Sequence, residues 1–352
     1  MQYARLGNTG LVVSRLAFGS MTFGSVSGGP FASTYKVDQA AANDLVALAI
    51  DRGVNFFNSA DVYAAGDSER ILGKAIGKKR HEVVIATKVG NRMGPGLVQA
   101  GLTRRHILAA VDDSLERLGT DYIDVYLVHK VDTLTPIEET IEALEDIVRR
   151  GKVRYIGFSN WPAWLAAKAV GIQRARGFSV FRAAEMYYSL IGRDLEHEVV
   201  PFCADAGIGV MVWSPLAGGF LSGKYTRENP QGGSGDRLST FEFLPNDRER
   251  GYRVVDLLKS IGARHGASPA QVALAWLLTR PTVTSLLVGA SKASQLDDNL
   301  GAADLKLTAD DLGELDAATK PVAPYPNWFT ERVADSKTHE ALGIALAAPP
   351  LR

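Results

Sequence analysis

The chain has 352 residues, a length that corresponds to about two domains of average size or to one large barrel. Lysine plus arginine number 39 and aspartate plus glutamate number 39, so the formal net charge is zero. This balance argues against a protein that binds nucleic acid or a membrane surface, because such proteins usually carry a basic excess. Hydrophobic residues make up 46% and charged residues 22%, the composition of a globular protein that can bury a full core.

A single cysteine, Cys203, excludes an internal disulfide, and none of the Cys/His spacings typical of zinc sites occurs. The six histidines include no HxxxH pair, so we expect no metal. The first residues contain no apolar signal segment, and no apolar run approaches the ~18 residues of a membrane span. We therefore expect a soluble, cytoplasmic protein with no membrane partner and no nucleic-acid partner.

Short runs of β-branched and aromatic residues alternate along the chain with longer segments of 3.6-residue hydrophobic period. The expected strands span residues 14–20, 53–59, 82–88, 121–129, 153–160, 180–186, 207–214 and 284–291. Helices are expected at residues 39–52, 103–118, 136–150 and 196–206. The third of these has Thr135 as a predicted N-cap and Pro136 at its first position.

The expected strands follow one another at regular intervals. They end near Gly19, Asn58, Lys88, His129, Ser159, Glu185, Trp213 and Gly289, at intervals of 26 to 41 residues except for the last, of 76 residues. We attribute that long interval to a loop insertion before the last helix and strand. Eight strands in this rhythm, most of them buried on both faces, predict an α/β fold of the (β/α)₈ TIM-barrel type with long loops at its C-terminal face.

The whole chain, residues 1–352, is expected to form one domain, with residues 331–352 as a peripheral tail. Residues 1–7 and 11–14 are expected to pair as a short N-terminal hairpin that covers the bottom of the barrel. A doubly wound sheet is the competing fold, but it normally carries a glycine-rich phosphate turn after its first strand. No GxGxxG or GxxxxGK[ST] pattern occurs, which favours the barrel.

Polar side chains end several of the expected core strands. Each alone has an ordinary structural explanation, such as a solvated lysine at a strand end or a residue that caps the next helix. In a barrel of this type all of these strand ends meet at the C-terminal face, where such enzymes have their active sites. So many polar residues on one rim predict a functional site there: Asn58, Lys88, His129, Ser159, Asn160, Glu185, Trp213 and Ser214.

Several segments resemble the aldo-keto reductase superfamily over about residues 1–330, in particular bacterial members related to potassium-channel β subunits. They are FFNSADVY at 56–63, ATK ending at Lys88, YLVH ending at His129, GFSN at 157–160, WSPLAGGFLSGKY at 213–225 and GASKASQLDDNL at 289–300. The resemblance implies a catalytic tetrad that falls on Asn58, Tyr63, Lys88 and His129. The family usually has aspartate where this chain has Asn58.

These residue types suit the reduction of a carbonyl group. Hydride transfer leaves charge on the carbonyl oxygen, so a proton donor within hydrogen-bond reach is needed, and Tyr63 can supply it. The Lys88 ammonium is expected to lower the pKa of Tyr63 by stabilising the phenolate. His129 can donate a hydrogen bond that orients and stabilises the carbonyl oxygen.

The resemblance further implies that Ser159 and Asn160 hold the nicotinamide carboxamide and that Trp213 stacks on its ring. A lysine and an arginine beside a serine suit a 2′-phosphate better than a ribose hydroxyl, which favours NADPH/NADP⁺ as the cofactor. The other residues implied in cofactor binding are Gly19, Ser20, Met21, Glu185, Ser214, Pro215, Leu216, Gly218, Lys224, Arg237, Gly289, Ser291, Lys292, Gln295 and Asn299.

The favoured function is therefore NADPH-dependent reduction of an aldehyde or ketone, with a small-molecule carbonyl as substrate. Four segments are expected to line a partly apolar substrate pocket: residues 21–35, residues 91–101, Trp161 with Trp164, and the tail around residues 325–328. An NADP(H)-binding regulatory or scaffold protein is the alternative, because Asn58 leaves the tetrad incomplete. A lyase or aldolase with a Schiff base on Lys88 is a third possibility, against which the cofactor-like segments argue.

Two departures from the family pattern concern charge: Asn58 is neutral, and Glu185 stands where the family usually has glutamine. Without a carboxylate partner, Lys88 is expected to have a lowered pKa, and Glu185 is expected to favour the oxidised nicotinamide. Both effects would favour reduction over oxidation. Because the two residues end strands on opposite sides of the barrel, we expect their effects to be additive. The alternative is that Asn58 only keeps a hydrogen bond to Lys88 and that Glu185 is a tolerated substitution.

Overall fold

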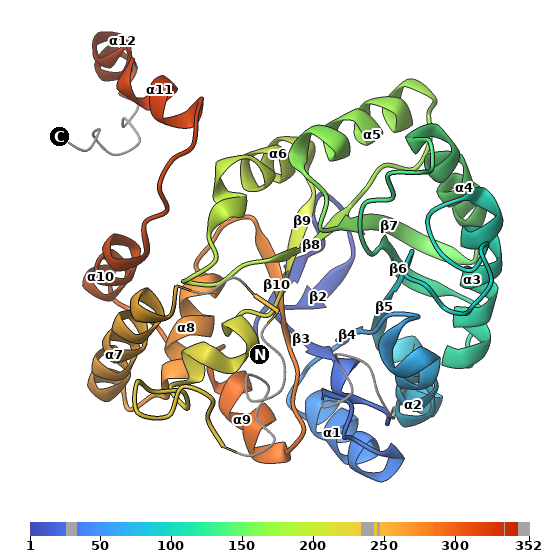
Figure 1. The fold of residues 1–352 in the computed structure, drawn as a ribbon, viewed down its shortest axis with the longest axis horizontal. Coiled ribbons are helices and arrows are strands. Elements are labelled where there is room, and N and C mark those ends of the chain that lie inside the picture. Colours follow the sequence, from blue (N-terminus) through green and yellow to red (C-terminus); the bar gives the residue numbers. More distant parts are fainter. Residues whose placement is uncertain (26–33, 234–242, 245–246, 334, 344–352) are drawn as a thin grey trace.

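The computed structural model describes residues 1–25, 34–233, 243–244, 247–333 and 335–343, and it confirms the predicted barrel. Eight strands close into a ring in the order β10-β3-β4-β5-β6-β7-β8-β9, every neighbouring pair parallel, with helices around the outside (Figure 1). The barrel strands are β3 (Leu16–Gly19), β4 (Phe56–Asn58), β5 (Val84–Val89), β6 (Ile123–Val128), β7 (Val153–Ser159), β8 (Ala183–Tyr187), β9 (Gly209–Trp213) and β10 (Val283–Val288).

The helices follow the strands in the expected alternation. They are α1 (Gln39–Asp51), α2 (Asp67–Ile76), α3 (Arg104–Leu118), α4 (Ile137–Arg149), α5 (Ala163–Ala175), α6 (Val199–Ala206), α7 (Arg248–His265), α8 (Pro269–Leu278), α9 (Ala293–Gly301) and α10 (Ala309–Thr319). In the parts of the chain that the structure describes, no helix is both long and apolar enough to cross a membrane.

Two of the predicted helix starts are wrong. Pro136 has an extended conformation and is itself the N-cap of α4, while the Thr135 hydroxyl donates to Asp132 Oδ2 at 2.6 Å instead of capping the helix. Helix α6 begins at Val199 because residues 194–197 form a separate 3₁₀ turn, η5 (Asp194–His197). In both cases the residue before the helix has non-helical backbone angles, φ −55° and ψ 135° at Pro136 and φ −139° and ψ −43° at Glu198.

The long interval before β10 contains a helix that the sequence analysis took for a loop insertion. Helix α7 starts at an Asp247 cap, whose carboxylate accepts from the Arg250 amide. Helix α8 follows after a capping box formed by Ser268 and Gln271. Two helices therefore lie in this interval, and α8 packs against β10 while α7 packs against α8.

The N-terminal hairpin closes the bottom of the barrel, as predicted. Strands β1 (Tyr3–Arg5) and β2 (Val12–Ser14) pair antiparallel. Leu6 and Val13 are fully buried against side chains inside the barrel. Gly7, at φ +52°, lies so close to the backbone of residues 182–209 that a Cβ atom would meet oxygen and nitrogen atoms within 2.8 Å. Only glycine fits this contact.

The interior of the barrel is a packed apolar layer. Its buried side chains come from every second strand position: Ala17, Phe56, Val84, Ala86, Val125, Leu127, Ala183, Met211 and Leu287. A second, larger core lies between the outer faces of the strands and the helices. Because the bottom and the middle of the barrel are filled, the polar side chains at the C-terminal strand ends lie on a closely packed apolar layer that limits their movement.

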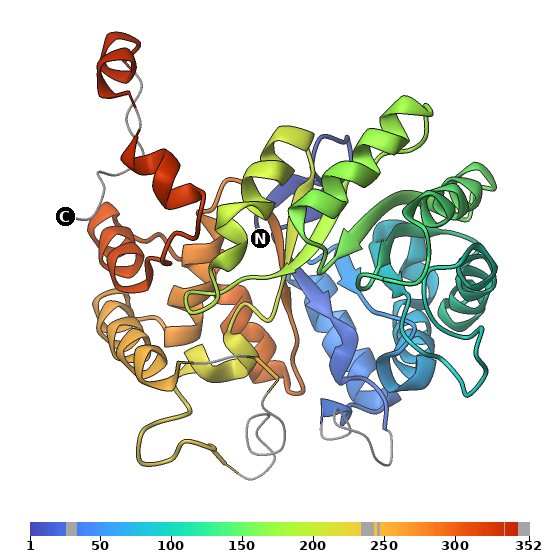
Figure 2. The same cartoon turned by 45° about the horizontal axis from the view of Figure 1, so that its top comes forward.

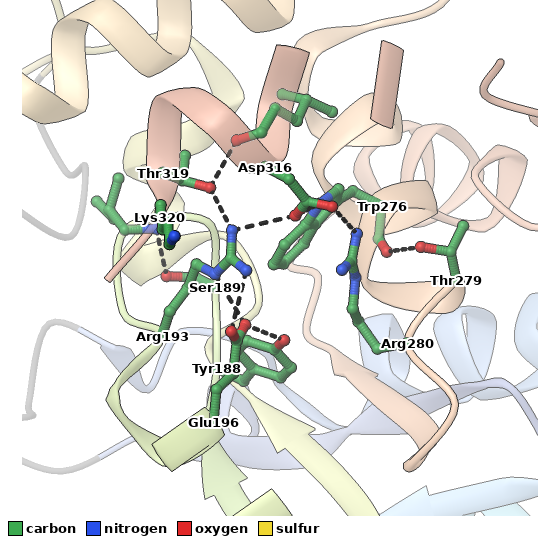
Figure 3. A network of polar contacts seen from close by, with 12 residues as sticks. Tyr188, Ser189, Arg193, Glu196, Trp276, Thr279, Arg280, Asp316, Thr319 and Lys320 are labelled. Atoms are coloured by element: carbon green, nitrogen blue, oxygen red, sulfur yellow. Dashed lines mark hydrogen bonds and ion pairs between the residues drawn. The ribbon is translucent and has the colours of Figure 1, made fainter. Parts of the chain in front are cut away.

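An arginine joins three separate elements on one side of the barrel (Figure 3). The Arg193 guanidinium donates to both oxygens of Glu196, at 2.8 and 2.9 Å, and to Asp316 and Thr319 on α10. Asp316 also accepts from the Trp276 indole on α8 at 3.1 Å. The segment after β8 is thereby fixed to α8 and α10. Beyond α10, the short helices α11 (Asn327–Arg332) and α12 (Ser336–Ala341) lie apart from the barrel (Figures 1 and 2).

Replacement of Arg193 by methionine is expected to lower the free energy of unfolding by about 2–4 kcal/mol, because it removes the arginine partner of Glu196 and one of the two arginines that pair with Asp316. Arg70→Met is the matched control, since Arg70 and Asp67 form an ion pair whose side chains are both 51% exposed. That change should cost less than about 0.5 kcal/mol. Urea unfolding of both variants is the measurement, and equal losses would contradict a structural role of the Arg193 network.

Candidate active site

Three side chains and one backbone carbonyl meet around the amino group of Lys88, which is completely buried on β5. Lys88 Nζ donates to Asn58 Oδ1 at 2.7 Å, to the Ser59 carbonyl at 2.8 Å and, more weakly, to the Tyr63 hydroxyl at 3.4 Å. The Glu185 carboxylate is 3.1 Å from the same nitrogen. The structure therefore brings the predicted residues Asn58, Tyr63 and Lys88 into one cluster and adds Glu185 to it.

Glu185 reaches this cluster from the far side of the barrel. Strand β8, which carries it, stands four positions from β4 in the ring of eight. Its Oε2 accepts a hydrogen bond from Asn58 Nδ2 at 2.7 Å, and both residues are 2% exposed. An eight-stranded barrel is just wide enough for inward side chains to fill, so residues on opposite strands touch.

The expectation that Lys88 lacks a carboxylate partner is wrong. Burial is the largest influence and opposes the charge on Lys88, but the Glu185 carboxylate and the Tyr63 hydroxyl together outweigh it and raise the pKa of Lys88 above its usual value. The expectation that Asn58 and Glu185 act additively loses its basis as well, because the two side chains are hydrogen-bonded and neighbours couple.

Tyr63 is half-buried next to Lys88, with the ammonium nitrogen 5.0 Å from the centre of its ring. Burial raises the pKa of Tyr63, the Lys88 charge lowers it and the Glu185 charge raises it, with a net increase. The effect of Lys88 has the predicted sign, but burial is the larger influence. Tyr63 therefore carries its proton at neutral pH, as a general acid must.

His129 faces Tyr63 edge-on, with the two ring centres 5.9 Å apart. Asn91, the first residue of a loop expected to line the substrate pocket, donates from Nδ2 to His129 Nδ1 at 2.8 Å, a contact that the sequence analysis did not predict. The ring proton is thereby placed on Nε2. Burial lowers the pKa of His129 well below its usual value, and the Lys88 and Lys130 charges add to this effect. His129 is a neutral hydrogen-bond donor.

Backbone strain is concentrated at this face of the barrel. Among the described residues, the non-glycine residues with positive φ are Ala64, Ala65, Asn160, Ser214 and Ala217, and each follows the C-terminal end of a barrel strand. Such conformations cost free energy and persist where the surrounding structure enforces them, commonly at functional sites. The strained backbone and the polar strand ends thus both indicate a functional site at the C-terminal face of the barrel.

Ser159, Asn160 and Trp213 lie side by side at the ends of β7 and β9. Asn160 Nδ2 donates to Ser159 Oγ at 2.9 Å, and the Trp213 indole donates to Asn160 Oδ1 at 3.0 Å. Ser159 in turn donates to the Glu185 carbonyl at 2.7 Å. The Tyr187 ring, absent from the sequence analysis, packs 5.2 Å from the Trp213 ring. These residues form one connected group next to the Lys88 cluster.

The remaining residues predicted to bind the cofactor lie on β3 or in the segments that follow β3, β9 and β10, as far as α9. Ser20 has its hydroxyl turned inward, where it donates to the Asn58 carbonyl at 3.1 Å. Ser214 Oγ accepts from the Gly218 amide at 3.0 Å and so fixes the turn after β9. The other members with described positions are Gly19, Met21, Pro215, Leu216, Lys224, Gly289, Ser291, Lys292, Gln295 and Asn299. Arg237 lies outside the described residues.

The residues expected to line the substrate pocket are spread out. Trp161 is 1% exposed and packs against Phe158 and Phe181 in the core. With Trp164 it borders a cavity of about 170 Å³ between α4 and α5, which none of Tyr63, Lys88 and His129 lines. The segment around Tyr325 leads into α11, whose first residue, Asn327, donates to the His197 carbonyl at 3.1 Å. The cavity is therefore separate from the Lys88 cluster.

A buried carboxylic acid, Asp61, lies next to the Lys88 cluster and was not identified from the sequence. Asp61 is fully buried two residues before Tyr63, and its carboxyl accepts no side-chain hydrogen bond. Burial raises the pKa of Asp61 to about 8, and the charge of Glu69 adds to the increase. Glu69 is itself buried and ion-paired with Arg117 at 2.6 Å. The position of Asp61 in the segment FFNSADVY did not indicate that its side chain is buried, because this burial depends on the closed barrel.

Comparisons with known proteins identify the family to which this chain belongs. Residues 15–320 match the Aldo/keto reductase family, and the chain belongs to that family of oxidoreductases, which generally use nicotinamide cofactors. Versiconal hemiacetal acetate reductase of Aspergillus parasiticus is 35% identical over 346 residues, covering 93% of this chain and 99% of the relative. A "Probable voltage-gated potassium channel subunit beta" of Arabidopsis thaliana is 37% identical over 312 residues, covering 87% and 92%. "Probable aldo-keto reductase 1" of Glycine max is 34% identical over 318 residues, covering 90% and 88%.

The raised pKa of Asp61 makes the stability of the protein depend on pH. Between about 4, the ordinary pKa of the unfolded chain, and about 8, the folded state keeps the Asp61 proton that the unfolded state has lost. The Asp61 contribution to stability therefore falls as the pH rises through this range. Asp61→Asn should become more stable relative to the parent from pH ~5 to pH ~8 in urea unfolding. A constant difference would show that Asp61 does not titrate in this range.

Proposed function

We propose that the protein reduces an aldehyde or ketone to an alcohol with NADPH, with Tyr63 as the proton donor. The observation that carries this proposal is the position of the Tyr63 hydroxyl, 3.4 Å from the buried Lys88 ammonium and beside a neutral His129. A protonated phenol, a fixed cation and a neutral imidazole donor converge on one point of the rim. This set of groups suits proton donation to an oxygen that gains negative charge.

The residues present fit a nicotinamide dinucleotide. Trp213 offers a half-buried aromatic ring beside the Lys88 cluster. Helix α9 starts after β10 without a side-chain cap, with Lys292 at its N-cap and Ser291 before it. The N-terminal backbone of α9, the Ser291 hydroxyl, which donates to Gln295 Oε1 at 3.2 Å, and the Lys292 ammonium form a donor set suited to phosphate. When bound, NADPH supplies the hydride.

Each residue of the cluster then has a defined task. Tyr63 donates its proton to the carbonyl oxygen, and the Lys88 ammonium stabilises the phenolate that remains. The contact of 3.4 Å between them is long in this structure and can shorten as charge develops on the phenol oxygen. His129 donates from Nε2 to the same carbonyl oxygen and orients it, held by Asn91.

A cofactor-binding regulatory protein is the second candidate, favoured by the relatives named as potassium channel β subunits. The two functions differ in turnover. NADPH absorbance followed with a panel of aldehydes and ketones should decline in the presence of a carbonyl that fits the site. Tight binding of NADPH without turnover on any carbonyl would favour the regulatory function.

Tyr63→Phe tests the proposed proton donor. Loss of a general acid reduces the rate by about 10²–10⁴-fold, so kcat should fall by this factor. NADPH affinity should change little, because the hydroxyl contributes a proton rather than a contact that holds the cofactor. Steady-state kinetics and fluorescence titration measure the two quantities, and activity within threefold of the parent would remove Tyr63 from the mechanism.

Lys292→Ala tests the cofactor preference. A charge-assisted hydrogen bond to the 2′-phosphate contributes roughly 1.5–3 kcal/mol, so the variant should bind NADPH at least about tenfold more weakly. NADH, which lacks this phosphate, should bind almost as it does to the parent. Equal losses for both cofactors would place Lys292 away from the 2′-phosphate and remove the basis for a preference for NADPH.

A further inference from the structure

We propose that Glu185 is the positioning residue that keeps Lys88 charged, and that Asn58 is the neutral link on which this arrangement depends. The carboxylate that supports the proton donor thus comes from β8, across the barrel, and not from β4 beside it. The inference deepens the proposed function, and only its activity measurements rest on that function.

The ionisation of Glu185 follows from its neighbours. Its Oε2 faces the Asn58 amide nitrogen at 2.7 Å and its Oε1 faces the Lys88 ammonium at 3.1 Å. Asn58 Nδ2 can only donate, so Oε2 accepts, and the proton between Oε1 and Lys88 Nζ is assigned to Lys88 under this proposal. Among the described residues, Glu185 is the only carboxylate that pairs with Lys88.

Asn58 is the side chain that fits between these two charges. Its amide oxygen accepts from Lys88 at 2.7 Å while its amide nitrogen donates to Glu185. An aspartate at this position would set two carboxylates against each other at hydrogen-bond distance, a situation in which one of them takes up a proton. The residue types at positions 58 and 185 therefore depend on each other. One of the two must carry the negative charge next to Lys88, and the other must be neutral.

The chemical consequence concerns the Tyr63–Lys88 pair, whose protons titrate together. With Glu185 ionised, the Glu185 carboxylate, the Lys88 ammonium and the neutral Tyr63 phenol have a total charge of zero. Loss of the first proton from Lys88 or Tyr63 therefore creates a buried negative charge. Without Glu185, the pair starts with a positive charge and loses its first proton at lower pH, whichever residue releases it. Glu185 accordingly extends the pH range over which Tyr63 can act as an acid.

The test compares Glu185→Gln, Asn58→Asp and the double variant, which moves the carboxylate from β8 to β4. In Glu185→Gln, the alkaline limb of single-turnover carbonyl reduction should move at least about one pH unit lower, since a charge at this distance shifts a pKa by about 1–3. Asn58→Asp should move it higher. The double variant restores one carboxylate next to Lys88 and should return the limb, the rate and the urea midpoint towards the parent.

A readout without turnover separates this inference from the proposed function. The protein labelled with ¹³C at the tyrosine ζ carbon, free of cofactor and substrate, reports the ionisation of Tyr63, whose signal is identified by its loss in Tyr63→Phe. Its titration should begin at lower pH in Glu185→Gln and return in the double variant. This result would support the inference even if no carbonyl were turned over.

Glu69→Gln combined with Asn58→Asp is the matched control, because Glu69 is an equally buried, ion-paired glutamate that contacts neither Asn58 nor Lys88. It should not rescue Asn58→Asp. The inference is overturned if Glu185→Gln leaves the Tyr63 titration where the parent has it. It is also overturned if the double variant is no more stable and no more active than the worse single variant.

Discussion

A buried ammonium requires a counter-charge, and much of the active face of this protein is arranged around that requirement. Lys88 has no exposure to solvent, so water cannot compensate its charge, and an unpaired ion in such a place would lose its proton. The Glu185 carboxylate supplies the compensation, while Asn58 and the Ser59 carbonyl complete the hydrogen bonds. The Tyr63 hydroxyl, at the longest distance, is the one contact that remains free to strengthen during a reaction.

This arrangement depends on the closed ring of strands. Glu185 and Asn58 are 127 residues apart in sequence and meet only because β4 and β8 face each other across a filled barrel. The hairpin and the apolar layer below leave these side chains little room to turn away. On the outside, the Arg193 network holds the segment after β8, the strand that carries Glu185.

The sequence allowed the barrel strands and the polar residues at their C-terminal ends to be predicted, because both depend on short stretches of neighbouring residues. Strand ends such as Lys88 and His129 follow apolar runs directly. The Lys88–Glu185 ion pair could not be predicted in this way, since it depends on side-chain reach across the barrel. The same holds for Asn91, whose contact with His129 depends on the path of a loop. Helix α7 was accessible in principle: Asp247 is a recognisable cap, and Val254, Leu258 and Ile261 repeat at helical spacing.

The central claim, one carboxylate across the barrel that keeps Lys88 charged beside a protonated Tyr63, can be tested by neutron diffraction from cofactor-free crystals grown in D₂O at neutral pH. We predict three deuterons on Lys88 Nζ, one on the Tyr63 oxygen and none on Glu185, whose oxygens should face Lys88 and Asn58. A deuteron on the Glu185 carboxyl together with a neutral Lys88 amine would contradict the account, and so would a Glu185 side chain turned away from Lys88.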